Sequence, residues 1–156
     1  MEWNKLDSNI RNSTYPVFRN HLLKIIRPEL NPVYNIKNYN GLKLLTRLRL
    51  SLSHLNEHRF NHNFHNCINP LCSCSLEVES IEHFFLHCHH YQNIRAKLFN
   101  NIKIIDKTLL KLSGEQLTNV LLYGVYQLDE NQNGKILDSS IEYIIESKHF
   151  DNSLFD

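Results

Sequence analysis

The chain has 156 residues, of which 42% are hydrophobic, and a formal net charge of +1. This length suits one domain or one and a half, and the hydrophobic content is sufficient for a core. No run of about eighteen apolar residues occurs, so we expect no membrane span. The N-terminus resembles neither a secretory signal nor a transit peptide, so we expect an intracellular protein, nuclear or cytoplasmic. Gly and Pro are scarce, at four each, which favours helices over a turn-rich sheet protein.

Charge is distributed unevenly along the chain. Residues 1–65 contain ten Lys or Arg and four Asp or Glu, which gives +6, whereas residues 66–156 contain seven and twelve, which gives −5. A basic half beside an acidic half suggests one surface that meets a polyanion and another that does not. An ordinary solvated surface with a chance bias in charge is the alternative interpretation.

The first third of the chain predicts two helices, a loop and a longer helix. We expect a short helix over residues 3–12 and a second over residues 14–27, which ends because Pro28 lacks the N–H that a helix interior needs. Residues 31–40 are rich in Asn and predict a loop. Residues 42–60 are the most regular segment, with a core-facing stripe at helical spacing. The stripe consists of Leu44, Leu45, Leu48, Leu52 and Leu55.

The helix expected over residues 42–60 also has a basic flank, which we assign to phosphate contact. The predicted nucleic-acid-binding residues are Lys43, Arg47, Arg49, His54, His58 and Arg59. The alternative is that these side chains only make the helix soluble. Histidines at positions 54, 58, 62 and 65 could line one side of a continued helix. They lack the His-Glu-x-x-His pattern, so they do not indicate a zinc protease, and a second metal site there is the weaker interpretation.

The segment that follows contains a complete ligand set for zinc. The predicted ligands are Cys72, Cys74, His83 and Cys88. Three thiols and one imidazole form a closed tetrahedral set, as structural Zn²⁺ requires. The first two follow Pro70, where we expect a turn. The other two lie on a helix whose N-cap we expect to be Ser80.

The spacing between the last two ligands is irregular. His83 and Cys88 are five residues apart, which is about 140° out of phase on an ideal α-helix. We therefore expect the helix to tighten or bend between them. Cys67 and His87 are the alternative ligands. Free thiols in a core and disulfides are the alternatives to a metal, but the clustering of all four cysteines within residues 67–88 favours the metal.

The helical pattern continues beyond the metal segment. Phe84 and Phe85 follow the core period, so we expect them to pack inside rather than to stack on bases. Their stripe extends over residues 91–98. Arg95, Lys97, Lys103 and Lys107 give this later helix a modest basic face.

The last third of the chain predicts short helices and a final longer one. In residues 109–122, Ser113 followed by Gln116 resembles a capping box. We expect the helix to end at Gly124. Residues 129–134 are expected to form a polar loop, residues 136–148 a last helix with its charged side chains outward, and residues 151–156 a frayed end.

These segments together predict a mainly α protein, an irregular helical bundle with a small Cys-Cys-His-Cys zinc-binding turn–helix unit. We divide it into a basic helical segment over residues 1–66, the zinc-binding unit over residues 67–90 and a C-terminal helical segment over residues 91–156. The three segments are expected to form one continuous domain.

Residues 44–55, 69–80 and 83–88 carry a resemblance to a known family. With their Cys-x-Cys and His-x₄-Cys pairs, they resemble the C-terminal zinc-binding region downstream of the polymerase in non-LTR retrotransposon reverse transcriptases. The resemblance extends over most of the chain. It implies zinc ligation by Cys72, Cys74, His83 and Cys88, and a role that faces RNA or DNA of a mobile element.

The sequence lacks the signals of an enzyme. It contains no Tyr/Phe-x-Asp-Asp polymerase motif, no cluster of acids that would hold Mg²⁺, and no Gly-rich phosphate loop. We therefore expect no catalysis and no small-molecule substrate. The expected function is that of a zinc-binding, nucleic-acid-binding accessory domain. The alternative is a zinc-stapled structural or protein–protein interaction module, and a catalytic zinc would need the open coordination position that this ligand set does not leave.

Overall fold

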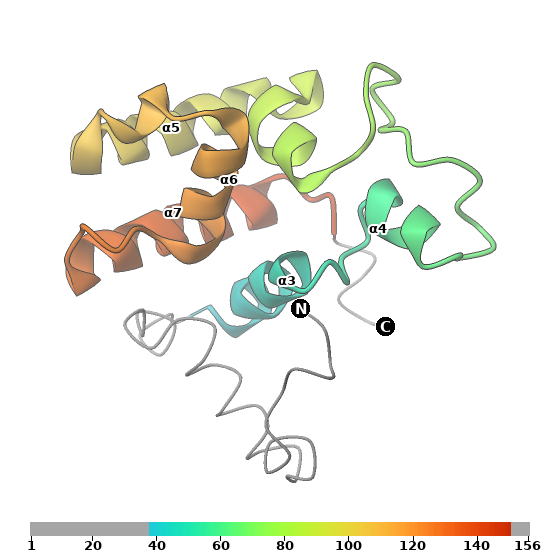
Figure 1. Cartoon of the computed structure of the whole chain (residues 1–156), viewed down its shortest axis with the longest axis horizontal. Coiled ribbons are helices and arrows are strands. Elements are labelled where there is room, and N and C mark those ends of the chain that lie inside the picture. Colours follow the sequence, from blue (N-terminus) through green and yellow to red (C-terminus); the bar gives the residue numbers. More distant parts are fainter. Residues whose placement is uncertain (1–37, 151–156) are drawn as a thin grey trace, which may run out of the picture. The chain divides into compact units, whose positions relative to one another are not determined.

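The computed structural model of the protein describes residues 38–150, and elements are labelled as in Figure 1. The helices expected over residues 3–12 and 14–27 and the end over residues 151–156 lie outside the described residues. Within residues 38–150 the fold is mainly helical, and an isolated antiparallel bridge between Leu71 and Val78 is the β-structure present. The prediction of an irregular helical bundle is confirmed. None of the helices in this part of the chain is long and apolar enough to cross a membrane.

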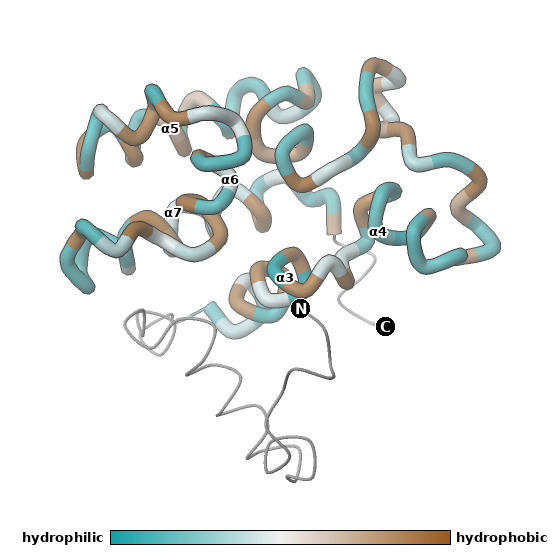
Figure 2. The backbone as a smooth tube through the Cα atoms, viewed as in Figure 1, coloured by the Kyte–Doolittle hydropathy of each residue, from teal (hydrophilic) through white to brown (hydrophobic). Residues whose placement is uncertain are grey.

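Helix α7 (Glu130–Glu146) is the centre of the bundle. It packs against α3 (Tyr39–Arg49), α5 (Gln92–Asp106) and α6 (Gly114–Tyr123), as Figure 1 shows. Apolar and polar residues alternate along these helices at the helical period (Figure 2), so that each helix buries one face. The completely buried side chains include Leu45, Leu48, Leu98, Ile102, Leu121, Ile136, Leu137 and Ile144.

Capping boxes begin both α6 and α7. The Ser113 hydroxyl accepts from the N–H of Gln116 at 3.3 Å, and the Gln116 side chain accepts from the N–H of Ser113 at 3.2 Å, which confirms the predicted cap. Asp129 and Gln132 make the same pair of bonds at 2.7 and 3.2 Å. Helix α7 therefore begins directly after Asp129, and the prediction of a loop over residues 129–134 is wrong. The polar residues there satisfy the first free N–H groups of a helix.

The helix predicted over residues 42–60 is two helices. Helix α3 ends at Arg49, and the short α4 spans Asn56–Asn61. Ser51 adopts a left-handed conformation with φ 54°, and the N–H of Leu52 bonds back to the Arg47 carbonyl at 2.9 Å. This arrangement is the Schellman ending of a helix, in which Gly is the usual residue. Because Ser occupies this position, the sequence contains no Gly that would indicate the end of the helix.

The break removes part of the predicted stripe and of the predicted histidine row. Leu52 is 55% exposed, whereas the other leucines of the stripe are buried. Helix α4 ends before His62, so the four histidines between positions 54 and 65 do not share one helix. The row that suggested a second metal site is therefore not formed.

Shorter helical turns and one buried amide complete the described part. The turns are η3 (His83–His87), η4 (His89–Tyr91) and η5 (Leu109–Lys111). Helix α6 ends at Gly124, as predicted, with φ 77°. The amide of buried Asn133 accepts from the N–H of Val125 at 2.7 Å and donates to the carbonyl of the same residue at 2.9 Å. These bonds fix the connection between α6 and α7.

Candidate metal centre

Cys72 and Cys74 lie on a tight turn closed by the Leu71–Val78 bridge. The N–H of Cys72 bonds to the Glu77 carbonyl at 2.9 Å. Ser75 has a left-handed conformation with φ 63° and bonds back to the Cys72 carbonyl at 2.8 Å. The turn therefore presents both sulfurs from one short loop, as the position of Pro70 predicts.

His83 and Cys88 belong to the helical segment that follows the turn. The Ser80 hydroxyl accepts from the N–H of His83 at 3.0 Å, which confirms the predicted N-cap. The N–H of Cys88 bonds to the His83 carbonyl at 2.8 Å, a π-helical bond that spans five residues instead of four. The helix therefore widens between the two residues instead of tightening, which is one of the two distortions expected there. The wider turn returns Cys88 to the side of His83.

The π-helical turn is supported from the core. In an α-helix the Phe84 carbonyl would accept from the N–H of Cys88, but that N–H is bonded to His83. The Phe84 carbonyl instead accepts from the hydroxyl of Tyr143 on α7 at 2.6 Å. The Phe84 ring packs edge-on against the Tyr143 ring, and the Phe85 ring stacks on the Tyr143 ring. The ring centroids are 5.2 Å apart in both pairs. Both phenylalanines are buried, as predicted.

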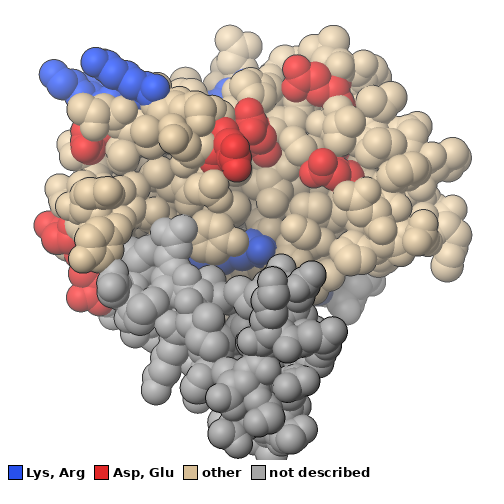
Figure 3. All heavy atoms as spheres, in the orientation of Figure 1, with Lys and Arg blue, Asp and Glu red and all other residues tan. Residues whose placement is uncertain are grey.

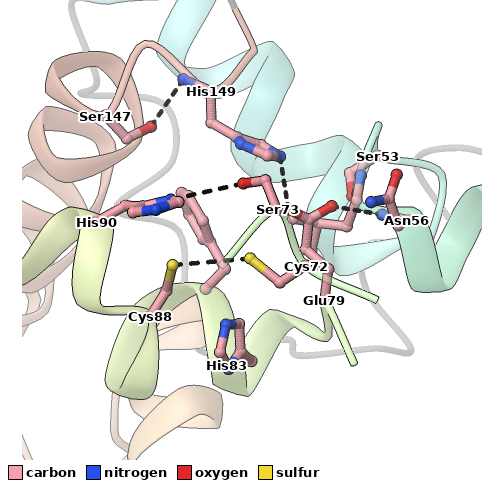
Figure 4. A network of polar contacts seen from close by, with 12 residues as sticks. Ser53, Asn56, Cys72, Ser73, Glu79, His83, Cys88, His90, Ser147 and His149 are labelled. Carbon is pink, nitrogen blue, oxygen red and sulfur yellow. Dashed lines mark hydrogen bonds and ion pairs between the residues drawn. The ribbon is translucent and has the colours of Figure 1, made fainter. Parts of the chain in front are cut away.

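The four predicted ligands converge on one point. One donor atom each from Cys72, Cys74, His83 and Cys88 lies within 4.8 Å of all the others. The sulfurs of Cys72 and Cys88 are 3.7 Å apart and face each other beside the ring of His83 (Figure 4). Zn–S bonds near 2.3 Å at tetrahedral angles would place two sulfurs about 3.8 Å apart. All four cysteines of the chain are free thiols, so the group has the donors and the spacing that a tetrahedral metal ion needs.

A backbone N–H two residues further along the chain acts to lower the pKa of each of the three thiols. The N–H of Cys74 acts on Cys72, that of Leu76 on Cys74 and that of His90 on Cys88. The N–H of Leu76 is the main reason that the pKa of Cys74 falls to about 7. Burial raises the pKa of Cys72 to about 12 and also raises that of Cys88. A bound cation would reverse the effect of burial, because a coordinating thiol is deprotonated.

The imidazole of His83 is held on both sides. Its Nε2 lies 3.3 Å from the Cys74 sulfur, and its Nδ1 lies 2.9 Å from the Glu77 carboxylate. The hydrogen bond to His83 lowers the pKa of Glu77. An ionised carboxylate on Nδ1 places the ring proton there and leaves Nε2 as a lone-pair donor. Sequence analysis missed Glu77, whose only signal is an acidic residue between the two ligand pairs.

A buried polar network lies next to the cluster. The carboxylate of Glu79 accepts from the N–H of Asn56 at 2.7 Å and pairs with His149 at 3.6 Å. The other ring nitrogen of His149 lies 2.8 Å from the Tyr91 hydroxyl. Figure 4 shows Glu79 between Asn56 and His149. The network ties α4 and the turn after α7 to the segment that carries the four candidate ligands. The sequence pattern contains no signal for it.

The two alternative ligands lie outside the cluster. The Cys67 sulfur is 3.4 Å from the Asn56 carbonyl and 3.3 Å from the Asn69 carbonyl. The exposed His87 pairs with Glu82 at 3.4 Å. The geometry therefore favours the predicted set of Cys72, Cys74, His83 and Cys88.

Five of the six predicted nucleic-acid-binding residues interact with other groups of the protein, and Arg47 and His54 are among the five. Arg49 donates to the Leu122 carbonyl at 2.7 Å, and its guanidinium lies over the Tyr123 ring at 5.3 Å from the centroid. Arg59 donates to Asn66 at 2.8 Å. His58 is 4% exposed, and its Nδ1 lies 2.7 Å from the Ser53 hydroxyl. A side chain buried in this way has no free edge for a phosphate.

The basic surface of the described residues is smaller than the sequence predicts. Lys43, Arg47 and His54 are half-buried. Residues 38–150 contain eleven Lys or Arg and eleven Asp or Glu, so the described part has balanced charge. On the face shown in Figure 3, acidic and basic side chains are scattered among neutral ones.

Comparison of the chain with models of known protein families, with curated proteins and with solved structures finds no match. The geometry of the cluster is therefore the basis on which its chemistry is assigned.

Proposed function

We propose that Cys72, Cys74, His83 and Cys88 bind one Zn²⁺ ion as a structural site. The convergence of their four donor atoms within 4.8 Å carries this proposal. Three thiolates and an imidazole are the soft and intermediate donors that zinc prefers in tetrahedral sites. A set of four protein ligands leaves no coordination position for a substrate, so the proposed role is structural rather than catalytic.

The ion would join two pieces of structure. Two ligands come from the turn over residues 71–78, and two come from the π-helical turn that packs on the core. Without the ion, two buried thiols with raised pKa values would face each other. Metal binding at such a site releases protons and contributes directly to folding.

The test is the metal content of the purified full-length chain. We expect one equivalent of zinc by mass spectrometry, and a charge-transfer band from sulfur to metal after substitution with Co²⁺. Cys74→Ser should lose the metal, and Cys67→Ser is the matched control that should keep it. A chain without zinc, whose thermal midpoint does not respond to added Zn²⁺ or to a chelator, would contradict the proposal.

We propose further that this zinc-stapled module binds RNA or DNA, as its resemblance to retrotransposon reverse transcriptase tails suggests. Helix α3 contains Lys43, Arg47 and Arg49 and no Asp or Glu, which supports a basic surface on this helix. Lys43 and Arg47 are the residues assigned to phosphate contact. The buried His58 is left out.

Salt dependence distinguishes phosphate contact from adventitious binding. Each phosphate contact contributes about −0.9 to the slope of log K against log salt concentration for duplex DNA. Lys43→Ala and Arg47→Ala should each reduce this slope by about 1, whereas Lys111→Ala on η5 should leave it unchanged. Absence of binding to RNA and DNA at low salt would contradict this part of the proposal.

One observation favours a protein partner as the second candidate function. Leu71 and Val78 form a cross-strand pair on the cysteine-bearing turn, and both are exposed, as is Leu76 between them. Exposed apolar side chains grouped in this way are typical of interaction sites. In a pull-down with the full-length chain, a captured protein that remains after nuclease treatment would favour this candidate over nucleic acid. The Leu76→Ser variant should no longer capture it.

A further inference from the structure

The carboxylate of Glu77 is placed to control the metal-binding imidazole. We infer that Glu77 is a positioning residue, which fixes His83 in the tautomer and ring orientation that present Nε2 to the metal. The inference rests on the proposed zinc site. It adds a fifth residue to that site, one that acts on a ligand without being a ligand.

The contacts of the His83 ring define this role. Nε2 is the ring atom that faces the cysteines, at 3.3 Å from the Cys74 sulfur, and Nδ1 faces Glu77 at 2.9 Å. The ring is 3% exposed. A buried imidazole with two possible tautomers needs an acceptor on one nitrogen to keep the other available as a ligand. Glu77 provides that acceptor, and a carboxylate there also makes the imidazole a stronger donor to a metal.

The position of Glu77 separates this role from a general contribution to the fold. Its side chain is 60% exposed apart from the contact with His83. The neighbouring Glu79 is buried and bonds to the N–H of Asn56, so Glu79 holds the fold together whereas Glu77 does not. The Glu77 backbone carbonyl also closes the turn at Cys72, and this bond is preserved in any side-chain substitution.

The chain offers a matched control pair of the same chemistry. Glu82 and His87 form a second carboxylate–imidazole contact at 3.4 Å, with both side chains partly exposed. His87 is not among the four converging donors. Substitutions of Glu82 therefore remove an equivalent charge and hydrogen bond close to the site without touching a metal ligand.

The experiment compares Glu77→Ala with Glu82→Ala, and Glu77→Gln with Glu82→Gln, all in the full-length chain. Zinc affinity is measured by competition with a chromophoric chelator. We expect Glu77→Ala to weaken zinc binding by roughly 10- to 100-fold, the usual effect of losing such a partner. Glu77→Gln should cause a smaller loss, because its amide oxygen still accepts from Nδ1 but carries no charge. Both Glu82 variants should match the unaltered protein.

The tautomer of His83 is the second measurement. In the zinc-loaded protein and in Glu77→Gln, ¹⁵N chemical shifts should show the ring proton on Nδ1. In metal-free Glu77→Ala the proton should be shared between both nitrogens. The comparison applies to a metal-free Glu77→Ala whose ¹H–¹⁵N spectrum shows a folded bundle, because an unfolded chain would also share the proton.

Three results distinguish the possible failures. If Glu77→Ala binds zinc as tightly as Glu82→Ala, the positioning role is wrong while the zinc site stands. If Glu77→Ala does not fold, the zinc affinities of Glu77→Gln and Glu82→Gln are compared instead. Equal affinities of these two variants would overturn the inference. If the unaltered protein binds no zinc, the proposed zinc site itself is wrong, and the inference is overturned with it.

Discussion

The hydroxyl of Tyr143 provides a sensitive test of how the π-helical turn at His83–His87 is built. Tyr143→Phe removes one oxygen atom and keeps the ring, so the contacts with Phe84 and Phe85 remain and no large cavity forms. The lost bond is short, at 2.6 Å, and both residues are buried. The Phe84 carbonyl cannot recover the N–H of Cys88, because that N–H is bonded to His83.

The expected cost follows from leaving this carbonyl without a partner. A buried polar group that loses its hydrogen bond costs about 1–3 kcal/mol. For a chain of this length, that loss corresponds to a thermal midpoint lower by roughly 2–12 °C. The same substitution at an exposed tyrosine should change stability by less than about 0.5 kcal/mol.

The assay is urea and thermal denaturation of the zinc-saturated protein, with zinc content measured for each variant. Tyr126→Phe is the control, because Tyr126 is 72% exposed. The slope of the urea transition should be the same in both variants, since the surface exposed on unfolding is unchanged. If Tyr143→Phe is as stable as Tyr126→Phe, the π-helical turn does not depend on this bond, and the account of why the helix widens there is wrong.

Three further predictions concern single positions elsewhere in the described part. Gly124→Ala should destabilise the protein by about 1–3 kcal/mol, because Gly124 has φ 77° and a Cβ atom would collide with the Asn133 amide; an unchanged thermal midpoint would contradict this. Burial, and to a lesser degree the charge of a nearby histidine, lowers the pKa of His58 below its ordinary value of 6.5. The unfolded chain therefore takes up this proton first, so stability should fall as the pH drops from 6.5 towards the lower pKa of the folded state. His58→Asn, whose amide oxygen can still accept from Ser53, should lose this part of the acid sensitivity in denaturation midpoints measured between pH 7.5 and 5.5, and an equal loss of stability in both proteins would refute the assignment. Cys67→Ser should leave zinc affinity unchanged in the chelator competition, because the Cys67 sulfur lies against backbone carbonyls outside the cluster; weaker binding would show that Cys67 is a ligand.

Local chemistry explains which predictions agree with the structure. The Ser113–Gln116 cap, the Ser80 cap and the turn at Cys72–Cys74 each depend on residues within a few positions of one another. The burial of Phe84 follows from the helical period alone. Such features can be read from the chain because the interacting groups are brought together by the backbone conformation of one short segment.

The departures occur where the usual signal residue is missing or replaced. Ser51 occupies the position at which Gly usually ends a helix, so the end of α3 has no signal in the sequence. Asp129 and Gln132 stand in a run of polar residues that suggests a loop, yet they cap α7. In the first case composition predicted that the helix continues, and in the second it predicted a loop. In both cases the hydrogen bonds of a few side-chain and backbone groups produced the opposite structure.

The sequence by itself determined the chemical character of the candidate site, because three thiols and an imidazole within seventeen residues, at positions 72–88, supply the donor types that a tetrahedral zinc site uses. Tertiary structure alone decided how His83 and Cys88 reach the same point, since in the widened turn the Phe84 carbonyl is bonded to the Tyr143 hydroxyl from α7, fifty-nine residues away. It also decided that His58 is buried and that Glu79 meets His149. These outcomes depend on which helix faces pack together, and the packing of distant segments is not encoded in the spacing of any one of them.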